Sequence, residues 1–233
     1  MYNNENPDYQ INQAGVGTIV DPDTTIARTF LRLSGLIGIL GGTAVYTNFL
    51  INTGVLSLSS MGILSLIGAL AGLGMVFYIS SKRQSFSYAT LASLLVGFAA
   101  LEGFSLSFIF YQYSLATLNY VFLLTSGIFV GMAILGYVFK MNYGWMGTFL
   151  MGSIIGIIIV SLVNLFIGNE TLSIGIAYFG VVVMSGFIAY DMSNLKELAY
   201  EPDRRIELVM AMSFFINFIN LFLFLLRIFG SRE

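Results

Sequence analysis

Uncharged runs of about 20 residues recur along almost the whole chain, and they limit the possible folds more than any other feature of the sequence. A helix of this length is about 30 Å long, enough to cross the hydrocarbon core of a bilayer. Only 9% of the 233 residues are charged, whereas a soluble domain carries about 25%. The chain is therefore expected to be an integral membrane protein, with the lipid bilayer as its surroundings and partner.

The apolar runs predict an all-α fold of seven transmembrane helices. Barrel strands would alternate over about 10 residues, whereas these runs are continuously apolar. The residues before the first run are polar and acidic, so residues 1–27 are interpreted as a disordered cytoplasmic tail and residues 28–230 as the transmembrane domain. The predicted spans are 31–51, 58–80, 88–111, 116–139, 145–168, 171–192 and 207–229.

The basic residues predict the orientation, because Lys and Arg near span ends stay preferentially in the cytoplasm. With the N-terminus inside, the outer loops near 52–57, 112–115 and 168–171 hold no basic residue. Arg227 and Arg232 lie at the end of the seventh run, on the outer side, and leave open a re-entrant last segment that returns the C-terminus to the cytoplasm. The other eight of the ten basic residues lie inside: Arg28, Arg32, Lys82, Arg83, Lys140, Lys196, Arg204 and Arg205.

The missing residue types exclude several chemistries. The chain has no Cys and no His, so it has no thiolate nucleophile, no Ser-His-Asp triad and no imidazole that titrates near neutral pH. A net charge of -2 gives no sign of nucleic-acid binding. We therefore expect a protein that is not an enzyme and has no cofactor, and whose pH response, if any, depends on carboxylates.

Small residues recur at a spacing that favours close helix packing in lipid. The sequence predicts that they pack helices within one bundle, with a homodimer seam as the alternative. The pairs are Gly68 and Gly72, Gly127 and Gly131, and Gly152 and Gly156.

A few polar side chains lie within the predicted spans, where such groups are candidates for function. Glu102 lies near the middle of the third span, and either lines a wet cavity or is a protonated acid bonded to the backbone. Asp191 lies at the inner end of the sixth span, as a functional or an ordinary interfacial carboxylate. Ser213, Asn217 and Asn220 share one stripe of the seventh, which is either a hydrogen-bond clamp or a pore lining.

Two stretches resemble the signature region of the Bax inhibitor-1 family of seven-span membrane proteins: AYDMSNL at 189–195 and AMSFFINFINLFLFLLRIFG at 211–230. ALEGFSLSFIF, which contains Glu102, is similar to the third span of bacterial members. The resemblance implies six helices around a hydrophobic seventh, a pH-sensitive calcium leak, and a place in a bacterial cell (inner) membrane.

The resemblance also implies a latch at the cytoplasmic mouth. In the best-understood bacterial type of the family, two aspartates on the sixth and seventh helices share a proton and form this latch with a basic residue at the end of the second helix. The resemblance puts Asp191 at the first aspartate position and Asn217 at the second, with Lys82 or Arg83 as the cation. An Asp–Asn pair has one titrating group where two aspartates have two, so it implies a latch without the shared proton.

The depths of the two latch residues differ if the helices are straight. Asp191 is close to the end of its predicted span, and Asn217 is well inside the next, which leaves about 10 Å between them along the membrane normal. Either a sixth helix that continues past Asp191 or a seventh that starts deep in the bundle closes this gap.

The leading functional hypothesis is a cation leak of Bax inhibitor-1 type, with Ca²⁺ or protons as the permeant ions. Glu102, Ser213 and Asn220 are the expected lining of the path, and Glu102 and Asp191 are expected to contact calcium transiently, since Ca²⁺ prefers oxygen ligands. The alternative is an interaction protein that modulates a membrane-embedded quality-control protease through its acidic tail.

Overall fold

The structure, a computed structural model, describes residues 21–83, 85–139, 143–201 and 203–230. In these ranges it has seven α helices, a short 3₁₀ helix η1 and no strand. Each α helix, the third taken together with η1, is long and apolar enough to cross a membrane, which confirms the predicted seven-span fold. The elements are α1 (Pro22–Asn52), α2 (Leu58–Lys82), α3 (Tyr88–Leu106), η1 (Ser107–Tyr111), α4 (Leu115–Val138), α5 (Tyr143–Ile167), α6 (Glu170–Leu198) and α7 (Arg205–Phe229).

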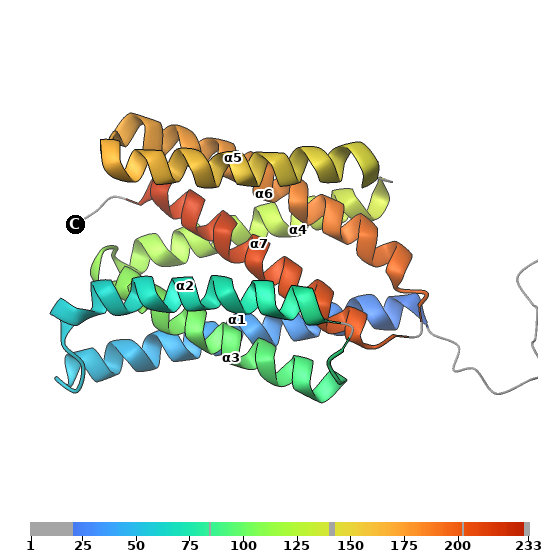
Figure 1. The fold of residues 1–233 in the computed structure, drawn as a ribbon, viewed down its shortest axis with the longest axis horizontal. Helices are drawn as coiled ribbons and strands as arrows, with labels where there is room; N and C mark the ends of the chain where they lie inside the picture. Colours follow the sequence, from blue (N-terminus) through green and yellow to red (C-terminus); the bar gives the residue numbers. More distant parts are fainter. Residues whose placement is uncertain (1–20, 84, 140–142, 202, 231–233) are drawn as a thin grey trace, which may run out of the picture.

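The last helix, α7, is the centre of the bundle. It crosses the view of Figure 1 diagonally, between α1, α2 and α3 on one side and α5 on the other. It packs against α6, α1, α4 and α3, and more than half of its most apolar stretch is buried, against a third or less in every other span. The helices α2 and α5 form the outer edges, where α2 packs on α3 and α5 on α6.

One end of the bundle, here named the basic end, collects most of the described basic residues. It is the end at which α6 is joined to α7, on the right in Figure 1. Because α7 runs from this end to the opposite one as a single helix, it is a spanning helix rather than a re-entrant segment. Lys140 and Arg232, used above for the orientation, lie outside the described residues. The basic residues at this end are Arg28, Arg32, Lys82, Arg83, Lys196, Arg204 and Arg205.

The first helix begins earlier than predicted. Asp21 caps it, because its carboxylate accepts hydrogen bonds from the Asp23 backbone N–H at 3.2 Å and from the Thr24 hydroxyl at 2.6 Å, and Pro22 is preorganised for a first helical turn. Residues 22–27, assigned above to the tail, therefore belong to α1, and the domain starts before residue 28. The predicted tail at residues 1–20 lies outside the described residues.

The sixth helix continues past its predicted end at residue 192 and stops at Leu198. The short link that follows is held by Asp203, whose carboxylate accepts from the backbone N–H of Arg205 at 2.9 Å and pairs with the Arg205 guanidinium at 2.8 Å. These contacts hold the pKa of Asp203 below its usual range. The link thereby fixes where α7 begins.

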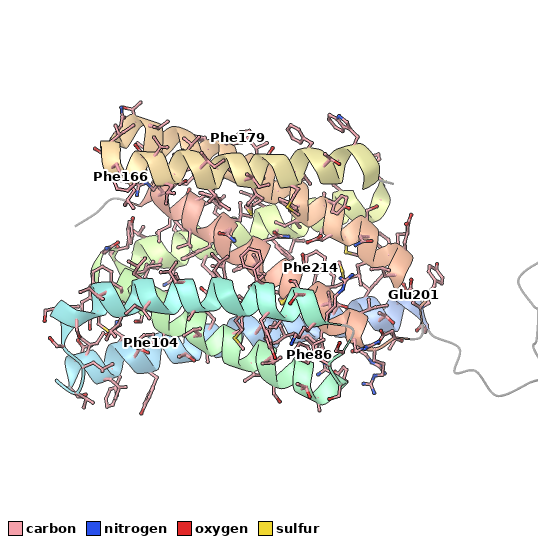
Figure 2. All side chains as sticks on the ribbon, viewed as in Figure 1. Phe86, Phe104, Phe166, Phe179, Glu201 and Phe214 are labelled. Atoms are coloured by element: carbon pink, nitrogen blue, oxygen red, sulfur yellow. The ribbon has the colours of Figure 1, made fainter. Side chains whose placement is uncertain are left out.

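Aromatic side chains of α7 form the centre of the core. Phe214, which Figure 2 labels in the middle of the bundle, stacks on Phe30 of α1 at 5.5 Å between ring centroids and meets Phe129 of α4 edge-on at 5.7 Å. Phe215 contacts Phe98 of α3 at 5.6 Å. Such pairs add roughly 0.5–1.5 kcal/mol each beyond their buried area. They hold α7 against three other helices at once.

Glycines lie where helices approach each other most closely, but only some of the glycines predicted to pack helices are at such a contact. A Cβ at Gly68 or Gly72 of α2 would overlap the side chains of α3, so the predicted packing role of this pair is confirmed. Gly136 of α4, which was not predicted, lies directly against the backbone carbonyl of Ala189 in α6. By contrast, Gly127, Gly131, Gly152 and Gly156 have no atom within 4 Å of such a Cβ, so their predicted role inside the bundle is wrong.

Replacing Gly136 by alanine is expected to destabilise the protein, because the added Cβ overlaps the Ala189 carbonyl. Overpacking of this kind costs about 1–3 kcal/mol, so the midpoint of thermal unfolding in detergent micelles should fall. Gly131→Ala in the same helix is the matched control, since its Cβ meets nothing within 4 Å. Equal midpoints for the two variants would contradict the close α4–α6 contact.

Candidate functional site

A buried carboxylate joins the sixth helix to the central seventh. Asp191 of α6 is only 7% exposed, and its Oδ2 accepts a hydrogen bond from the Ser213 hydroxyl at 2.5 Å and from the Asn217 amide at 2.7 Å. Both donors lie on α7, one helical turn apart, so they point to the same side of that helix. Asp191, Ser213 and Asn217 are named the Asp191 cluster below.

The Asp191 cluster has no cation. Both donors are neutral, and no basic side chain of the described residues lies within 4.0 Å of the Asp191 carboxylate. The other carboxylate oxygen, Oδ1, accepts no hydrogen bond from the described part of the chain. One acceptor position of a membrane-embedded carboxylate is therefore left for a proton, a water molecule or a cation.

The extension of α6 brings the cluster together. Because α6 runs on to Leu198, Asp191 lies about 10 Å before the end of the helix instead of at its last turn. It thereby reaches the depth of Ser213 and Asn217 on α7. Of the two ways of closing the predicted gap, the structure has the first, a sixth helix that continues past Asp191.

Asn220 is not part of the cluster, although it belongs to the predicted stripe. Its amide donates to the backbone carbonyl of Ile216 on α7 itself at 2.8 Å. An amide that is satisfied by its own helix needs no partner on a neighbour. The stripe is thus divided into two residues that bind Asp191 and one that does not.

Lys82 and Arg83, the two predicted latch cations, both lie in the described ranges and form no ion pair with Asp191. The ammonium of Lys82 lies over the ring of Tyr78, 5.5 Å from its centroid. Arg83 lines a surface depression at the α6–α7 link, which Asp203 and Arg205 also line. Both side chains are exposed at the basic end, away from the buried carboxylate.

Glu102 lies at a different helix contact. Its carboxylate rests on Gly72 of α2, where only a glycine leaves room for it. It is half-buried, and it makes no hydrogen bond or ion pair with the described residues. The bond to a backbone carbonyl that the sequence suggested as an alternative is therefore not formed there.

A second buried carboxylate, Glu207, was not singled out from the sequence. It is in the first turn of α7 and is 1% exposed. Its Oε1 lies 3.5 Å from Arg28 of α1 and 4.0 Å from Arg204, and its Oε2 lies 4.0 Å from Arg32 of α1. These four residues are named the Glu207 cluster below. The signal available in the sequence is the spacing of Arg28 and Arg32, which puts both on one face of a helix.

An apolar cavity of about 300 Å³ lies in the half of the bundle away from the basic end, between α1, η1, α4 and α7. Phe218 and Phe222 of α7 are part of its wall, together with Asn119 of α4. No three acidic side chains of the described residues lie close enough together to hold a metal ion.

Comparison with known proteins agrees with this architecture. Residues 23–233 match the family described as inhibitor of apoptosis-promoting Bax1. The chain belongs to the Bax inhibitor-1 family. It is similar to an uncharacterized protein of Deinococcus radiodurans, with 34% identity over 96% of this chain and 97% of the relative. It is also 36% identical to the inner membrane protein YbhL of Escherichia coli K12, over 72% of this chain and 75% of that protein.

A third relative, an uncharacterized membrane protein of Streptococcus pyogenes serotype M1, is 30% identical over 91% of this chain and 96% of its own length. These matches and the seven apolar helices make the protein a multi-pass membrane protein of the Bax inhibitor-1 family. In this family member the carboxylate of Asp191 meets an amide and a hydroxyl rather than a second carboxylate.

Removing the Asn217 amide is expected to destabilise the protein, because Asp191 then loses one of its two donors. A hydrogen bond to a charged group contributes about 1.5–3 kcal/mol, so Asn217→Ala should lower the unfolding midpoint in micelles. The matched control is Asn220→Ala, in which only a bond within α7 is lost. If Asn220→Ala is destabilised as much as Asn217→Ala, the hydrogen bond from Asn217 to Asp191 contributes no more to stability than a bond within α7.

Proposed function

We propose that the protein is a membrane leak channel for cations that passes Ca²⁺ and is closed at the basic end by the Asp191 cluster. The observation that carries the proposal is the pair of hydrogen bonds from Ser213 and Asn217 to Asp191. They join α6 to the helix at the centre of the bundle. A tie at this place holds α7 against α6 and keeps the basic end closed.

The strength of this tie suits a latch. Two hydrogen bonds to one carboxylate contribute a few kcal/mol in total at about 1.5–3 kcal/mol each. A free-energy difference of about 3–6 kcal/mol leaves a minor open state populated at roughly 0.005–1%, because each 1.4 kcal/mol is a factor of ten. A leak of low activity, rather than an open pore, is the expected behaviour of such a bundle.

The oxygen atoms of the cluster fit a cation that passes rather than one that stays. Ca²⁺ takes 6–8 oxygen ligands in a tight site, whereas the cluster offers one free carboxylate oxygen together with the hydroxyl and amide oxygens of Ser213 and Asn217. Glu102, a half-buried carboxylate without a partner among the described residues, is a second transient contact. Calcium is then the transported ion, and the protein needs neither a cofactor nor catalytic residues.

We also propose that the protein lies in a bacterial inner membrane with its N-terminus and the basic end in the cytoplasm. The concentration of Lys and Arg at this end supports the orientation. The name of the Escherichia coli relative, inner membrane protein YbhL, supports the location.

The proposal is tested with the purified protein in liposomes loaded with a calcium-sensitive dye. A calcium flux above that of empty liposomes between about pH 6 and 8, where a buried carboxylate can titrate, is the expected result. Asp191→Ala should increase the flux, because it removes the acceptor of both latch hydrogen bonds. A flux no greater than that of empty liposomes over this range would refute the leak.

The pH dependence of the flux is expected to become steeper in Asn217→Asp. The wild-type cluster has one titrating group, whereas two carboxylates in contact repel each other and titrate as a coupled pair. The comparison is the flux of both proteins in the same liposomes across the pH range. Asn220→Asp is the matched control, since Asn220 is one turn away and does not contact Asp191. Identical pH profiles for wild type and Asn217→Asp would rule out the latch.

Deleting the N-terminal tail separates the leak from the alternative function, in which the tail is held by a membrane-embedded quality-control protease. The deletion should stop at residue 20, because Asp21 caps α1. The truncated protein is expected to keep its calcium flux in liposomes, which contain no protease. Loss of flux with unchanged thermal stability would mean that the tail takes part in transport.

A further inference from the structure

We propose that Arg28, Arg32 and Arg204 form a binding site for the phosphate of an anionic phospholipid, with Glu207 as the residue that positions them. The site is at the basic end, where the start of α1 meets the start of α7. It is separate from the Asp191 cluster and does not depend on the proposed leak activity.

The three guanidinium groups have far more hydrogen-bond donors than the protein satisfies. Each carries five N–H donors, yet the described residues accept only one of them, the 3.5 Å bond from Arg28 to Glu207. Arg32 and Arg204 approach Glu207 only to 4.0 Å, which is an ion pair without a hydrogen bond. Most of these donors are therefore available to a ligand.

Two buried atoms of the cluster lack partners. The Nε atom of Arg32 and the Oε2 atom of Glu207 are both inaccessible and make no hydrogen bond. Buried polar atoms are normally paired, so these two atoms show that the guanidiniums are not drawn close to Glu207 by the carboxylate alone. An anion cannot pair with Oε2, which is itself an acceptor, but one bound by the exposed N–H groups of the three arginines would draw the guanidiniums together above Glu207.

The charge of the cluster favours an anion. Three guanidiniums and one carboxylate leave a net charge of +2 if all are ionised, and Glu207 is the only carboxylate of the described residues within 4.0 Å of the three arginines. The neighbouring Asp203 is already bound to Arg205. Guanidinium groups match phosphate oxygens in a planar, two-pronged geometry, which makes phosphate the anion of choice.

The arginines lie at the depth of lipid headgroups. The uncharged part of α1 begins at Leu33 and runs to Ile51, about 28 Å of helix, which fills the hydrocarbon core. Arg32 is therefore at the edge of the core, and Arg28 is one turn outside it. Arg204 lies over the ring of Tyr88, 5.3 Å from the centroid, and Tyr is typical of this interface. A phospholipid phosphate is the anion found at this level.

The arginines are also accessible. The side chains of Arg28, Arg32 and Arg204 are 47%, 38% and 65% exposed, whereas that of Glu207 is 2% exposed. The carboxylate thus lies beneath the three guanidiniums and gathers them by attraction from the inner side. Their outer sides face the headgroup region, where the phosphate enters.

The test measures lipid binding to the full-length protein in detergent by native mass spectrometry, with phosphatidylglycerol and phosphatidylcholine as probes. Wild type is expected to prefer phosphatidylglycerol. In Arg28→Gln/Arg204→Gln its affinity should fall about tenfold or more, since two charge-assisted hydrogen bonds are lost. The matched control, Lys82→Gln/Arg83→Gln, removes the same charge from the same end and should stay within about twofold of wild type.

A single substitution, Arg204→Gln, tests the site in case the double variant does not fold. Arg204→Gln leaves Arg28 and Arg32 beside Glu207, so it should fold and weaken phosphatidylglycerol binding by a smaller factor. Thermal unfolding adds a second readout, because a lipid that binds only the folded state raises the midpoint. Phosphatidylglycerol should raise it in wild type and in the control, and less in Arg204→Gln.

Three results would overturn the proposal. Equal loss of binding in the Lys82/Arg83 control would mean that the lipid responds to general charge and not to this site. Equal binding of phosphatidylcholine would remove the preference for an anionic lipid. Soluble glycerol 3-phosphate that displaces the lipid at similar concentration would show that the ligand is a free phosphate ester.

Discussion

The need to satisfy a carboxylate inside a membrane bundle governs the arrangement of the last two helices. An unpaired polar group in hydrocarbon costs several kcal/mol, so Asp191 must be placed where other helices offer donors. Ser213 and Asn217 provide them from α7. This requires α7 to lie inside the bundle and α6 to extend beyond Asp191, and both are seen. The aromatic contacts of Phe214 and Phe215 then fill the space around α7.

The sequence predicts the parts of this fold that depend on local composition. Seven apolar runs give seven helices, since hydrocarbon leaves the backbone few alternatives, and the spacing of Ser213 and Asn217 puts both on one face of α7. The ends of α1 and α6 are predicted less well. The apolar run of α6 predicts an end at residue 192, although the helix continues through the mostly polar residues 193–197 to Leu198. The first helix, α1, likewise includes the polar residues from Pro22 onward. Hydropathy marks where the hydrocarbon ends, and a helix is free to continue into the interface.

Contacts between distant residues are beyond what one sequence reveals. The ion pair of Arg28 and Glu207 joins residues 179 positions apart, and nothing in the local pattern of either residue names the other. The glycine pairs make the same point, because Gly72 of α2 and Gly131 of α4 occur in similar contexts. Yet Gly72 supports the Glu102 carboxylate, and Gly131 has no neighbour within 4 Å of its Cβ position. Spacing along a helix shows which residues share a face but not which face meets a neighbour.

The two buried carboxylate clusters are both attached to α7. Glu207 near its start faces Arg28 and Arg32 of α1, and Ser213 and Asn217 hold Asp191 of α6. Glu207 and Ser213 are about 9 Å apart along the axis of one helix, so they move together when that helix moves. A displacement of α7 large enough to break its bonds with Asp191 therefore also changes the ion pairs of Glu207. In the proposed leak, both clusters would stabilise the closed arrangement, and the proposed phospholipid would add to that stability by holding the arginines against Glu207 of α7.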